Sequence, residues 1–303
     1  MSNKLENAKV LVIGAAGFIG GFVVSELLKE PVKEVIIYDN FTRGKMENIE
    51  DSLKDPRCSI FPYGGDVREI DVLDKAMEGV DYVFHLAAMW LLHCKDFPRT
   101  AFDVNIAGTF NVLEACVKHK VKKLIYSSSA SVYGDAVQVP MTEDHPFNNK
   151  NFYGATKIAG EAMCTAYNDR YGLEIVGLRY MNVYGPGQDQ HAVYSGVVPI
   201  VLNKIDRNEA PSVNGDGSQA YDFIYVEDIA RCNIAAAKSQ MDSSKAALDI
   251  AKHQLDNSTV TAPISGKVSA KNISVGELTP AQTPSIILEN ENSVNILIKV
   301  ESV

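Results

Sequence analysis

The sequence has few of the features that mark a protein for nucleic acid or for a membrane. Its 29 Lys and Arg residues are outnumbered by 38 Asp and Glu residues, and the formal net charge at pH 7 is -9. Phosphate backbones and anionic lipid surfaces are bound by clustered cations, so this balance argues against both partners. No apolar run comes near the ~20 residues that are needed to span a bilayer.

Cysteine is also scarce and shows no metal-binding pattern. The five cysteines form no C-x-x-C pair, and the six histidines do not cluster with Cys or Asp at ligand spacing. We therefore expect no bound metal. An odd number of separated thiols suits a reducing compartment, and the N-terminal residues lack the segments of a secretion signal. These absences predict a cytoplasmic protein.

What the N-terminal part does have is the pattern of a nucleotide-binding turn. A short apolar run from Val10 to Ile13 precedes glycines at 14, 17 and 20, and an apolar helical stripe follows. This order predicts a strand, a tight turn at Gly14 and a helix. Gly17 would let the backbone approach a diphosphate, and Gly20 would let the helix pack closely on the strand. A glycine triplet alone does not establish such a site, because glycine-rich turns are common.

A second apolar strand, EVIIYDN, ends at Asp39. A carboxylate near this distance from the glycines binds the two ribose hydroxyls of an adenosine and repels a 2′-phosphate, which favours NAD over NADP. Arg43 lies close enough in sequence to blur that preference. The alternative role of Asp39 is that of a turn residue at a strand end.

Strand and helix patterns then alternate along the chain. CSIFPYGGDV is a predicted strand ending at Asp66, DYVFHLAAM a strand and turn reaching Ala87, and VKKLIYSSS a buried strand ending at Ser129. Helical segments separate these strands, the longest over residues 100–120. The alternation predicts an α/β fold with a doubly wound parallel sheet, helices on both faces, and ligands at the carboxyl ends of the strands.

A predicted helix that begins near Asn151 carries two residues with a chemical signal. Tyr153 and Lys157 are four residues apart, so they share a helical face, although this spacing also occurs on many helix surfaces. Tyrosine is a poor base, with a reference pKa of about 10. A neighbouring ammonium and a positive nicotinamide ring both favour the phenolate. We therefore predict that Tyr153 handles a proton with the help of Lys157 and a serine hydroxyl from the preceding strand end.

Eight motifs stand in order along the chain. They are Gly14-x-x-Gly17-x-x-Gly20, Asp39-Asn40, Gly65-Asp66-Val67, His85-Leu86-Ala87-Ala88, Asn105-x-x-Gly108-Thr109, Ser127-Ser128-Ser129, Tyr153-x-x-x-Lys157 and RYMNVYGPGQ. Over about residues 9–237 this set resembles an extended short-chain dehydrogenase/reductase. Within that family it is most similar to the NAD-dependent nucleotide-sugar epimerases and dehydratases, with UDP-glucose 4-epimerases as the nearest type. The resemblance implies a Rossmann fold, NAD, a nucleotide-sugar substrate (a UDP-sugar above all) and a homodimer.

The resemblance also implies roles for single residues. Ser129 is the predicted catalytic hydroxyl, beside Tyr153 and Lys157. Asn182 is predicted to anchor the substrate's diphosphate, with a turn-capping Asn as the alternative. Trp90, which the family pattern does not supply, is interpreted as a packing residue or as a substrate-binding residue that stacks on a sugar or base. The predicted cofactor contacts are Gly14, Gly17, Phe18, Ile19, Gly20, Asp39, Asn40, Arg43, Asp66, Val67, Leu86, Ala87, Ala88, Asn105, Tyr153, Lys157 and Tyr180.

Some positions depart from the family pattern. The 4,6-dehydratases carry an Asp-Glu pair after the catalytic hydroxyl residue, where this sequence has Ala130 and Ser131, which counts against a dehydratase of that kind. Tyr221 stands where family members usually carry an Arg, and Trp90 where a Lys is often found. Both substitutions weaken the assignment of UDP-glucose or UDP-galactose as the substrate. A nucleotide-sugar reductase or decarboxylase that uses the same chemistry stays an alternative function.

Residues after about 238 do not follow the family pattern. Residues 241–257 have helical spacing, and the remainder predicts short strands. Residues 240–303 resemble the hairpin and lipoyl half of membrane-fusion (efflux adaptor) proteins. We expect an NAD-binding Rossmann domain over 1–178, a small partial substrate-binding region over 179–238, and an atypical helix plus β-rich segment over 239–303. A fusion, which we favour, or a divergent substrate domain would explain this tail. With either origin we expect NAD binding with weak or absent epimerase turnover. A catalytically inactive chimeric NAD-binding scaffold is the second hypothesis.

Overall fold

The computed structural model describes residues 4–188, 197–210 and 221–239, together with three strands at 267–271, 286–289 and 296–298. The chain divides into two compact units, Met1–Ser239 and Gln240–Val303. The first unit contains every residue that the sequence singled out for chemistry.

Six parallel strands form the centre of the first unit, in the spatial order β3-β2-β1-β4-β5-β6. Their bounds are β1 Lys9–Ile13, β2 Glu34–Tyr38, β3 Cys58–Ile60, β4 Tyr82–His85, β5 Lys123–Ser129 and β6 Glu174–Tyr180. The order reverses at β1, because β1 pairs in parallel with β2 on one side and with β4 on the other. In an open parallel sheet, ligands bind beyond the carboxyl ends of the strands at such a switch point.

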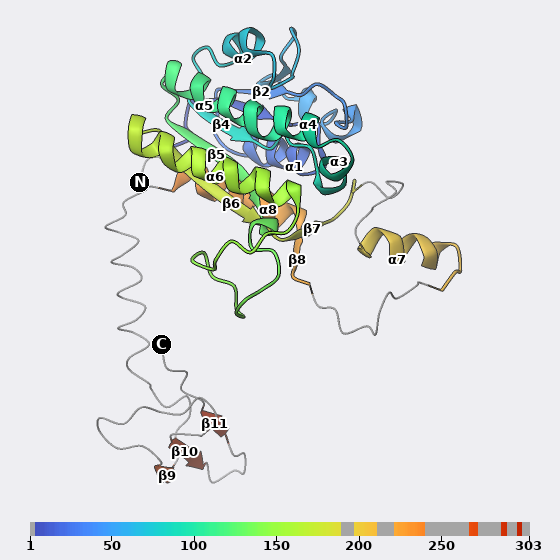
Figure 1. Cartoon of the computed structure of the whole chain (residues 1–303), viewed down its shortest axis with the longest axis vertical. Helices are drawn as coiled ribbons and strands as arrows, with labels where there is room; N and C mark the ends of the chain where they lie inside the picture. Colours follow the sequence, from blue (N-terminus) through green and yellow to red (C-terminus); the bar gives the residue numbers. More distant parts are fainter. Residues whose placement is uncertain are drawn as a thin grey trace. The chain divides into compact units, whose positions relative to one another are not determined.

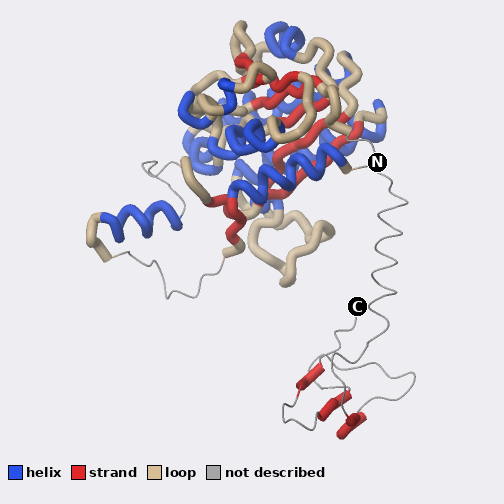
Figure 2. The backbone as a smooth tube through the Cα atoms, turned by 180° about the vertical axis from the view of Figure 1, so that it is seen from behind, coloured by secondary structure: helices blue, strands red, loops and turns tan. Residues whose placement is uncertain are grey.

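Helices cover both faces of this sheet (Figures 1 and 2). Val10 and Val12 of β1 belong to the core that contains residues of α1 and α8, whereas Leu11 and Ile13 belong to the core with α2, α5 and α6. Successive side chains of a strand point to opposite faces, so a strand buried on both sides is apolar throughout. The longer helices are α1 Phe18–Leu27, α2 Ile70–Ala76, α5 Gly108–Lys118, α6 Phe152–Tyr171, α7 Val197–Asp206 and α8 Val226–Lys238.

Short elements complete the first unit. They are η1 Met46–Asn48, η2 Ser52–Lys54, α3 Leu91–Asp96, α4 Pro98–Ala101, η3 Phe102–Ala107, η4 Ala130–Val132, and the parallel pair β7 Asn182–Tyr184 and β8 Phe223–Tyr225. The helix predicted over residues 100–120 is present as one unbroken helical run through α4, η3 and α5, in which η3 is a π-helix. Such wide turns are frequent at functional sites.

The doubly wound parallel sheet is confirmed, but one strand boundary is wrong. The strand predicted to end at Asp66 stops at Ile60. Pro62 lacks the N–H that a ladder requires, and Gly64 has a φ of +127°. Asp66 therefore lies on a loop beyond the sheet rather than directly at a strand end.

The second unit contains an antiparallel sheet in the order β11-β10-β9. Its strands are β9 Lys267–Lys271, β10 Ile286–Glu289 and β11 Ile296–Ile298. The strands agree with the β-rich pattern expected there. The helix predicted over 241–257 lies outside the described residues.

Candidate active site

The turn between β1 and α1 shows the close backbone approaches that its glycines predicted. Gly14 has a φ of +81°, and a Cβ there would lie 2.6 Å from the backbone nitrogen of Ala87. A Cβ at Gly20 would lie 2.2 Å from the carbonyl oxygen of Gly14. Gly17 is the N-cap residue of α1, whose first-turn amides suit an anion. We call residues 14–20 the glycine turn.

Asp39 fixes the loop after β2 to the glycine turn. One carboxylate oxygen accepts a hydrogen bond from the Ala16 N–H at 2.9 Å, and the other accepts one from the Phe41 N–H at 2.8 Å. Burial raises the pKa of Asp39, against the lowering effect of these two bonds. The Asn48 side chain adds a second attachment, donating to the Ala16 carbonyl at 2.7 Å. The carboxylate predicted to bind ribose is therefore held beside the glycine turn.

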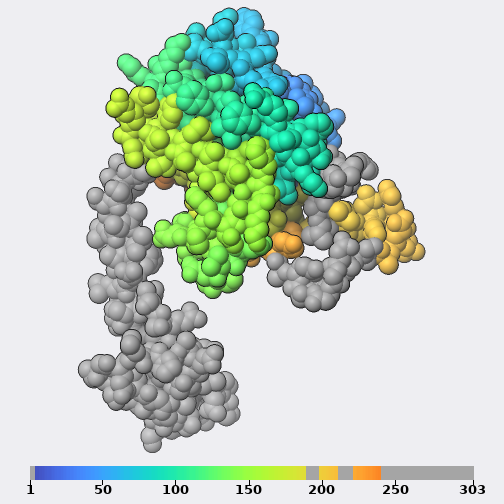
Figure 3. Space-filling model, in the orientation of Figure 1, coloured from blue at the N-terminus to red at the C-terminus, as the bar shows by residue number. Residues whose placement is uncertain are grey.

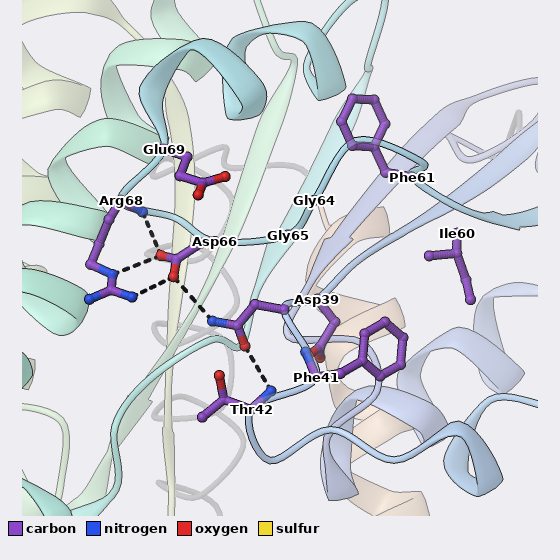
Figure 4. Close-up of a pocket in the computed structure, with 11 residues that line it drawn as sticks. Asp39, Phe41, Thr42, Ile60, Phe61, Gly64, Gly65, Asp66, Arg68 and Glu69 are labelled. Carbon is purple, nitrogen blue, oxygen red and sulfur yellow. Dashed lines mark hydrogen bonds and ion pairs between the residues drawn. The ribbon is translucent and has the colours of Figure 1, made fainter.

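A pocket of about 440 Å³ opens beside this loop (Figure 4). The Asp66 carboxylate in its wall accepts hydrogen bonds from Arg68 Nε at 2.9 Å and from the Asn40 side chain at 3.2 Å. Hydrogen bonding from Arg68 is the main cause that lowers the pKa of Asp66 to about 2. The pocket combines this ionised wall with apolar surface. Its lining residues are Asp39, Asn40, Phe41, Thr42, Ile60, Phe61, Gly64, Gly65, Asp66, Arg68 and Glu69.

Ser129, Tyr153 and Lys157 come together at the carboxyl end of β5, and we call them the Ser–Tyr–Lys group. Ser129 is the last residue of β5, and the other two occupy the first turns of α6. The Ser129 side chain accepts a hydrogen bond from the Ser131 N–H at 3.2 Å and favours the ionised form of Tyr153 by lowering its pKa. Lys157 Nζ donates to the Ser127 carbonyl at 2.7 Å and lies 5.7 Å from the centre of the Tyr153 ring. The geometry that the helical spacing predicted is therefore present.

Burial dominates the proton affinities of this group. It raises the pKa of Tyr153 to about 12, although the Ser129 hydrogen bond lowers it. Burial lowers the pKa of Lys157 to about 8. The predicted lowering of the Tyr153 pKa by the ammonium together with a positive nicotinamide ring stays a prediction, since it concerns the protein with its cofactor bound.

Two predicted cofactor residues are engaged by contacts within the protein. The amide of Asn105, buried in η3, accepts from the Met89 N–H at 2.7 Å and donates to the Met89 carbonyl at 2.9 Å. The Tyr180 hydroxyl lies 3.0 Å from Ser127 Oγ and donates to Asn233 at 2.9 Å. Asn105 thus fixes the loop after β4, and Tyr180 joins β5 and β6 to α8.

The predicted substrate residues also have partners. Asn182 begins β7, is exposed, and donates from its side chain to the Asp222 carbonyl at 3.0 Å. Trp90 directly precedes α3 and is half-buried. The Arg43 guanidinium lies 4.7 Å from the centre of the Trp90 ring. Tyr221, which replaces the usual Arg, is 65% exposed.

The remaining predicted cofactor residues lie at the same carboxyl edge of the sheet. The N–H groups of Leu86 and Ala87 donate to the Ile13 carbonyl, which joins the end of β4 to the end of β1. Phe18 and Ile19 form the first turn of α1, and Val67, Ala88 and Asn40 lie on the loops that follow β3, β4 and β2.

A network behind the Ser–Tyr–Lys group was missed by sequence reasoning. Arg179 of β6 makes two parallel hydrogen bonds to Glu161 of α6, at 2.9 and 2.8 Å. Ser128 donates to the same carboxylate, and Arg179 also donates to the Tyr133 hydroxyl at 2.9 Å and the Glu143 carbonyl at 2.7 Å. The network joins β5, α6, β6 and the segment after η4. The only signal in the sequence was the position of Glu161, one helical turn beyond Lys157.

The described part of the chain shows neither a membrane-spanning helix nor a cluster of metal ligands. Among the helices that the structure describes, none combines the length and apolar character needed to cross a membrane. Within the same residues, no three His, Cys, Asp or Glu side chains are grouped so that they could hold a metal ion.

Comparisons with known proteins agree on one family. A family model described as the NAD dependent epimerase/dehydratase family matches residues 10–251. A putative UDP-glucose 4-epimerase of Methanocaldococcus jannaschii is 37% identical over 230 residues, which are 75% of this chain and 72% of that protein. The UDP-N-acetylglucosamine 4-epimerase of Methanobrevibacter ruminantium, solved with UDP-N-acetylmuramic acid, has a TM-score of 0.73 at 37% identity, covering 78% of this chain and 74% of its own. The Thermus thermophilus UDP-glucose 4-epimerase, solved with NAD, has a TM-score of 0.67 at 33% identity, covering 77% and 75%.

Proposed function

The chain belongs to the NAD dependent epimerase/dehydratase family, and we propose that it is an NAD-dependent epimerase of nucleotide sugars. The observation that carries this proposal is the meeting of Ser129, Tyr153 and Lys157 at the end of β5, where the buried Lys157 Nζ lies 5.7 Å from the centre of the Tyr153 ring. The epimerase relatives support the reaction class.

The carboxyl edge of the sheet fits NAD. Glycines at 14 and 20 occupy positions where a Cβ would collide with backbone, so the turn is as tight as a diphosphate site requires. Asp39 lies beside this turn to take the ribose hydroxyls, and the pocket around Asp66 is the place for the adenine. Bound NAD would supply a reversible hydride acceptor at this edge, and a hydride that is returned to the sugar leaves the reaction redox-neutral.

The residues of the chain manage the proton and the position of the sugar. Tyr153 takes the proton of the sugar hydroxyl while the carbon is oxidised and gives it back when the carbon is reduced. Ser129, at the end of β5 beside the phenol, holds the reacting oxygen. Lys157 is fixed by the Ser127 carbonyl, so its charge stays one helical turn from the phenol. Holding the partners in place supplies much of the rate.

The substrate that the relatives favour is a UDP-hexose. The test incubates the purified chain with NAD and, separately, UDP-glucose and UDP-N-acetylglucosamine, and follows the 4-epimers by chromatography. We expect epimer formation with no lasting change in the nicotinamide absorbance band. Stoichiometric formation or consumption of NADH would instead identify a reductase or decarboxylase.

We further propose that residues 239–303 are an appended segment of the efflux-adaptor type. We also propose that the chain binds NAD while its epimerase turnover is weak or absent. The separate compact unit beginning at Gln240 and its antiparallel sheet support this proposal. Calorimetric titration with NAD and with UDP-sugars separates the two functions. Tight NAD binding without sugar-nucleotide binding would favour the scaffold hypothesis. Robust turnover of a UDP-hexose would contradict the prediction of weak or absent turnover.

A homodimer through α5 and α6 is the assembly we propose. These helices pack side by side on the face turned toward the viewer in Figure 3. Phe102, Phe110, Phe152 and Tyr171 on and beside them are between 40% and 54% exposed. Large exposed apolar side chains mark interaction surfaces. Light scattering of the unaltered protein should give twice the chain mass of 33.1 kDa. The Phe110→Lys variant should have the mass of a monomer.

A further inference from the structure

Two loops meet where the sheet reverses its strand order. Arg43 lies on the loop after β2 and Trp90 on the loop after β4, and 4.7 Å separates the guanidinium carbon from the ring centre. Strands β2 and β4 flank β1 on opposite sides. The Arg43–Trp90 contact therefore bridges the carboxyl end of β1, where the glycine turn begins.

The chain on each side of this contact is anchored to the glycine turn. A Cβ at Gly44 would lie 2.7 Å from the Ala16 Cβ, and the Lys45 N–H donates to the Ala16 carbonyl at 2.9 Å. On the other side, Ala87 lies so close to Gly14 that a Cβ added at Gly14 would be 2.6 Å from the backbone nitrogen of Ala87. The two side chains thus extend from backbone that is already fixed at the place where a diphosphate binds.

We propose that Arg43, held by stacking on Trp90, is the cation that contacts the diphosphate of bound NAD. The inference rests on the proposed function, because it needs a dinucleotide at this edge. Helix α1 offers its N-terminus to the same anion, but its sequence FIGGFVVSEL contains no Lys or Arg. A guanidinium can stack on an indole through its face while its N–H groups bond phosphate oxygens. Trp90 is then a positioning residue that acts through Arg43.

The same contact bears on the choice between NAD and NADP. Arg43 is not among the residues that line the pocket around Asp39 and Asp66, although Thr42 next to it is. An arginine engaged with Trp90 is directed to the diphosphate rather than to a ribose 2′-phosphate. Arg43 therefore does not offset the repulsion of a 2′-phosphate by Asp39.

The test compares NAD affinities by calorimetry for the whole chain and its Arg43→Gln, Trp90→Ala and Trp90→Phe variants. We expect Arg43→Gln and Trp90→Ala each to weaken NAD binding about tenfold, as loss of a charge-assisted phosphate contact does. Trp90→Phe keeps an aromatic face and should weaken binding by no more than about threefold. Lys54→Gln makes the same charge change at a side chain that is 77% exposed in η2, and should leave the affinity unchanged.

A double variant separates positioning from packing. If Trp90 acts through Arg43, Trp90→Ala should have no further effect on NAD affinity in the Arg43→Gln background. Arg43→Gln should also reduce the salt dependence of NAD binding, which a purely structural change would leave intact. Trp90 is the single tryptophan of the chain, so its fluorescence should change when NAD binds and when Arg43 is replaced.

Some results would overturn the inference. Arg43→Gln with the affinity of the unaltered chain would exclude the phosphate contact, and additive losses in the double variant would exclude the positioning role. Absence of NAD binding by the unaltered chain would overturn both this inference and the proposed cofactor. NAD binding without epimerisation would leave the Arg43 contact standing and overturn only the catalytic proposal.

Discussion

The two ends of the proposed cofactor site handle charge in opposite ways. At the adenosine end, the pKa of Asp66 is lowered to about 2 by Arg68, so this carboxylate is ionised at every working pH. At the reacting end, burial raises the pKa of Tyr153 to about 12 and lowers that of Lys157 to about 8, so both are pushed toward their neutral forms. The first end carries a permanent charge, and the second holds a phenol whose ionisation a neighbouring positive charge would favour.

The two ends are also built differently. At the adenosine end, local hydrogen bonds from Phe41 to Asp39 and from Arg68 to Asp66 join residues two apart. Longer-range bonds, such as that from the Ala16 N–H to Asp39, add to them. The reacting end depends on partners that are distant in sequence, including Arg179 with Glu161, so it exists only when the sheet has formed.

The strongest test of the reacting end is Tyr153→Phe. Loss of a positioned general base should reduce epimerase turnover by about 10³-fold. NAD affinity should change by less than about threefold, because the adenosine end and the glycine turn are untouched. Steady-state kinetics and calorimetry measure the two effects. Tyr171→Phe, an exposed tyrosine at the end of the same helix, is the matched control, and a Tyr153→Phe enzyme with near-normal turnover would remove the assigned base.

The long-range network is tested by Arg179→Met. The change leaves the partly buried Glu161 carboxylate without its bidentate partner, and we expect a loss of about 2 kcal/mol in the free energy of unfolding. Urea denaturation measures this loss. Lys54→Met breaks an exposed ion pair with Asp51 and should cost less than about 1 kcal/mol. Equal effects of the two changes would show that the network does not support the reacting end.

At the adenosine end, Asp39→Asn should alter cofactor choice rather than turnover. The amide removes the negative charge but can still accept one of the two backbone hydrogen bonds that fix the loop. We expect NAD affinity to fall about tenfold and NADP affinity to rise relative to it, because repulsion of a 2′-phosphate is lost. Calorimetry with both cofactors measures the ratio, with Asp51→Asn as the exposed control. An unchanged ratio would place the ribose elsewhere.

The smallest expected effect is a pH dependence of stability. The pKa of Lys157 is about 8 in the folded protein, below its usual value of 10.5. Between these values the unfolded chain binds a proton that the folded chain lacks, so the unfolding free energy rises with pH. The stability of the unaltered chain relative to Lys157→Met should increase by about 1 kcal/mol from pH 8 to pH 9. Denaturation at both pH values measures it, and a constant difference would contradict the buried, easily deprotonated lysine.

Much of the fold and part of the site followed from local pattern. The sequence predicted the tight turn from the glycines at 14 and 20. It also predicted the apolar strands and the shared helical face of Tyr153 and Lys157, because strand and helix periods place side chains on definite faces. The end of β3 was misjudged because the turn at Pro62 interrupts an otherwise strand-like sequence. The true engagement of Asn105 with Met89 depends on a loop sixteen residues away.

The sequence by itself determined that this chain forms a parallel α/β sheet with a tight glycine turn and a tyrosine and lysine on one helical face. These features depend on steric limits and periods within a few neighbouring residues. Only the tertiary structure decided that burial raises the Tyr153 pKa, that Glu161 pairs with Arg179, and that Arg43 stacks on a residue of another loop. Desolvation and long-range contacts are set by the order in which strands lie side by side, and strand order is a property of the whole sheet.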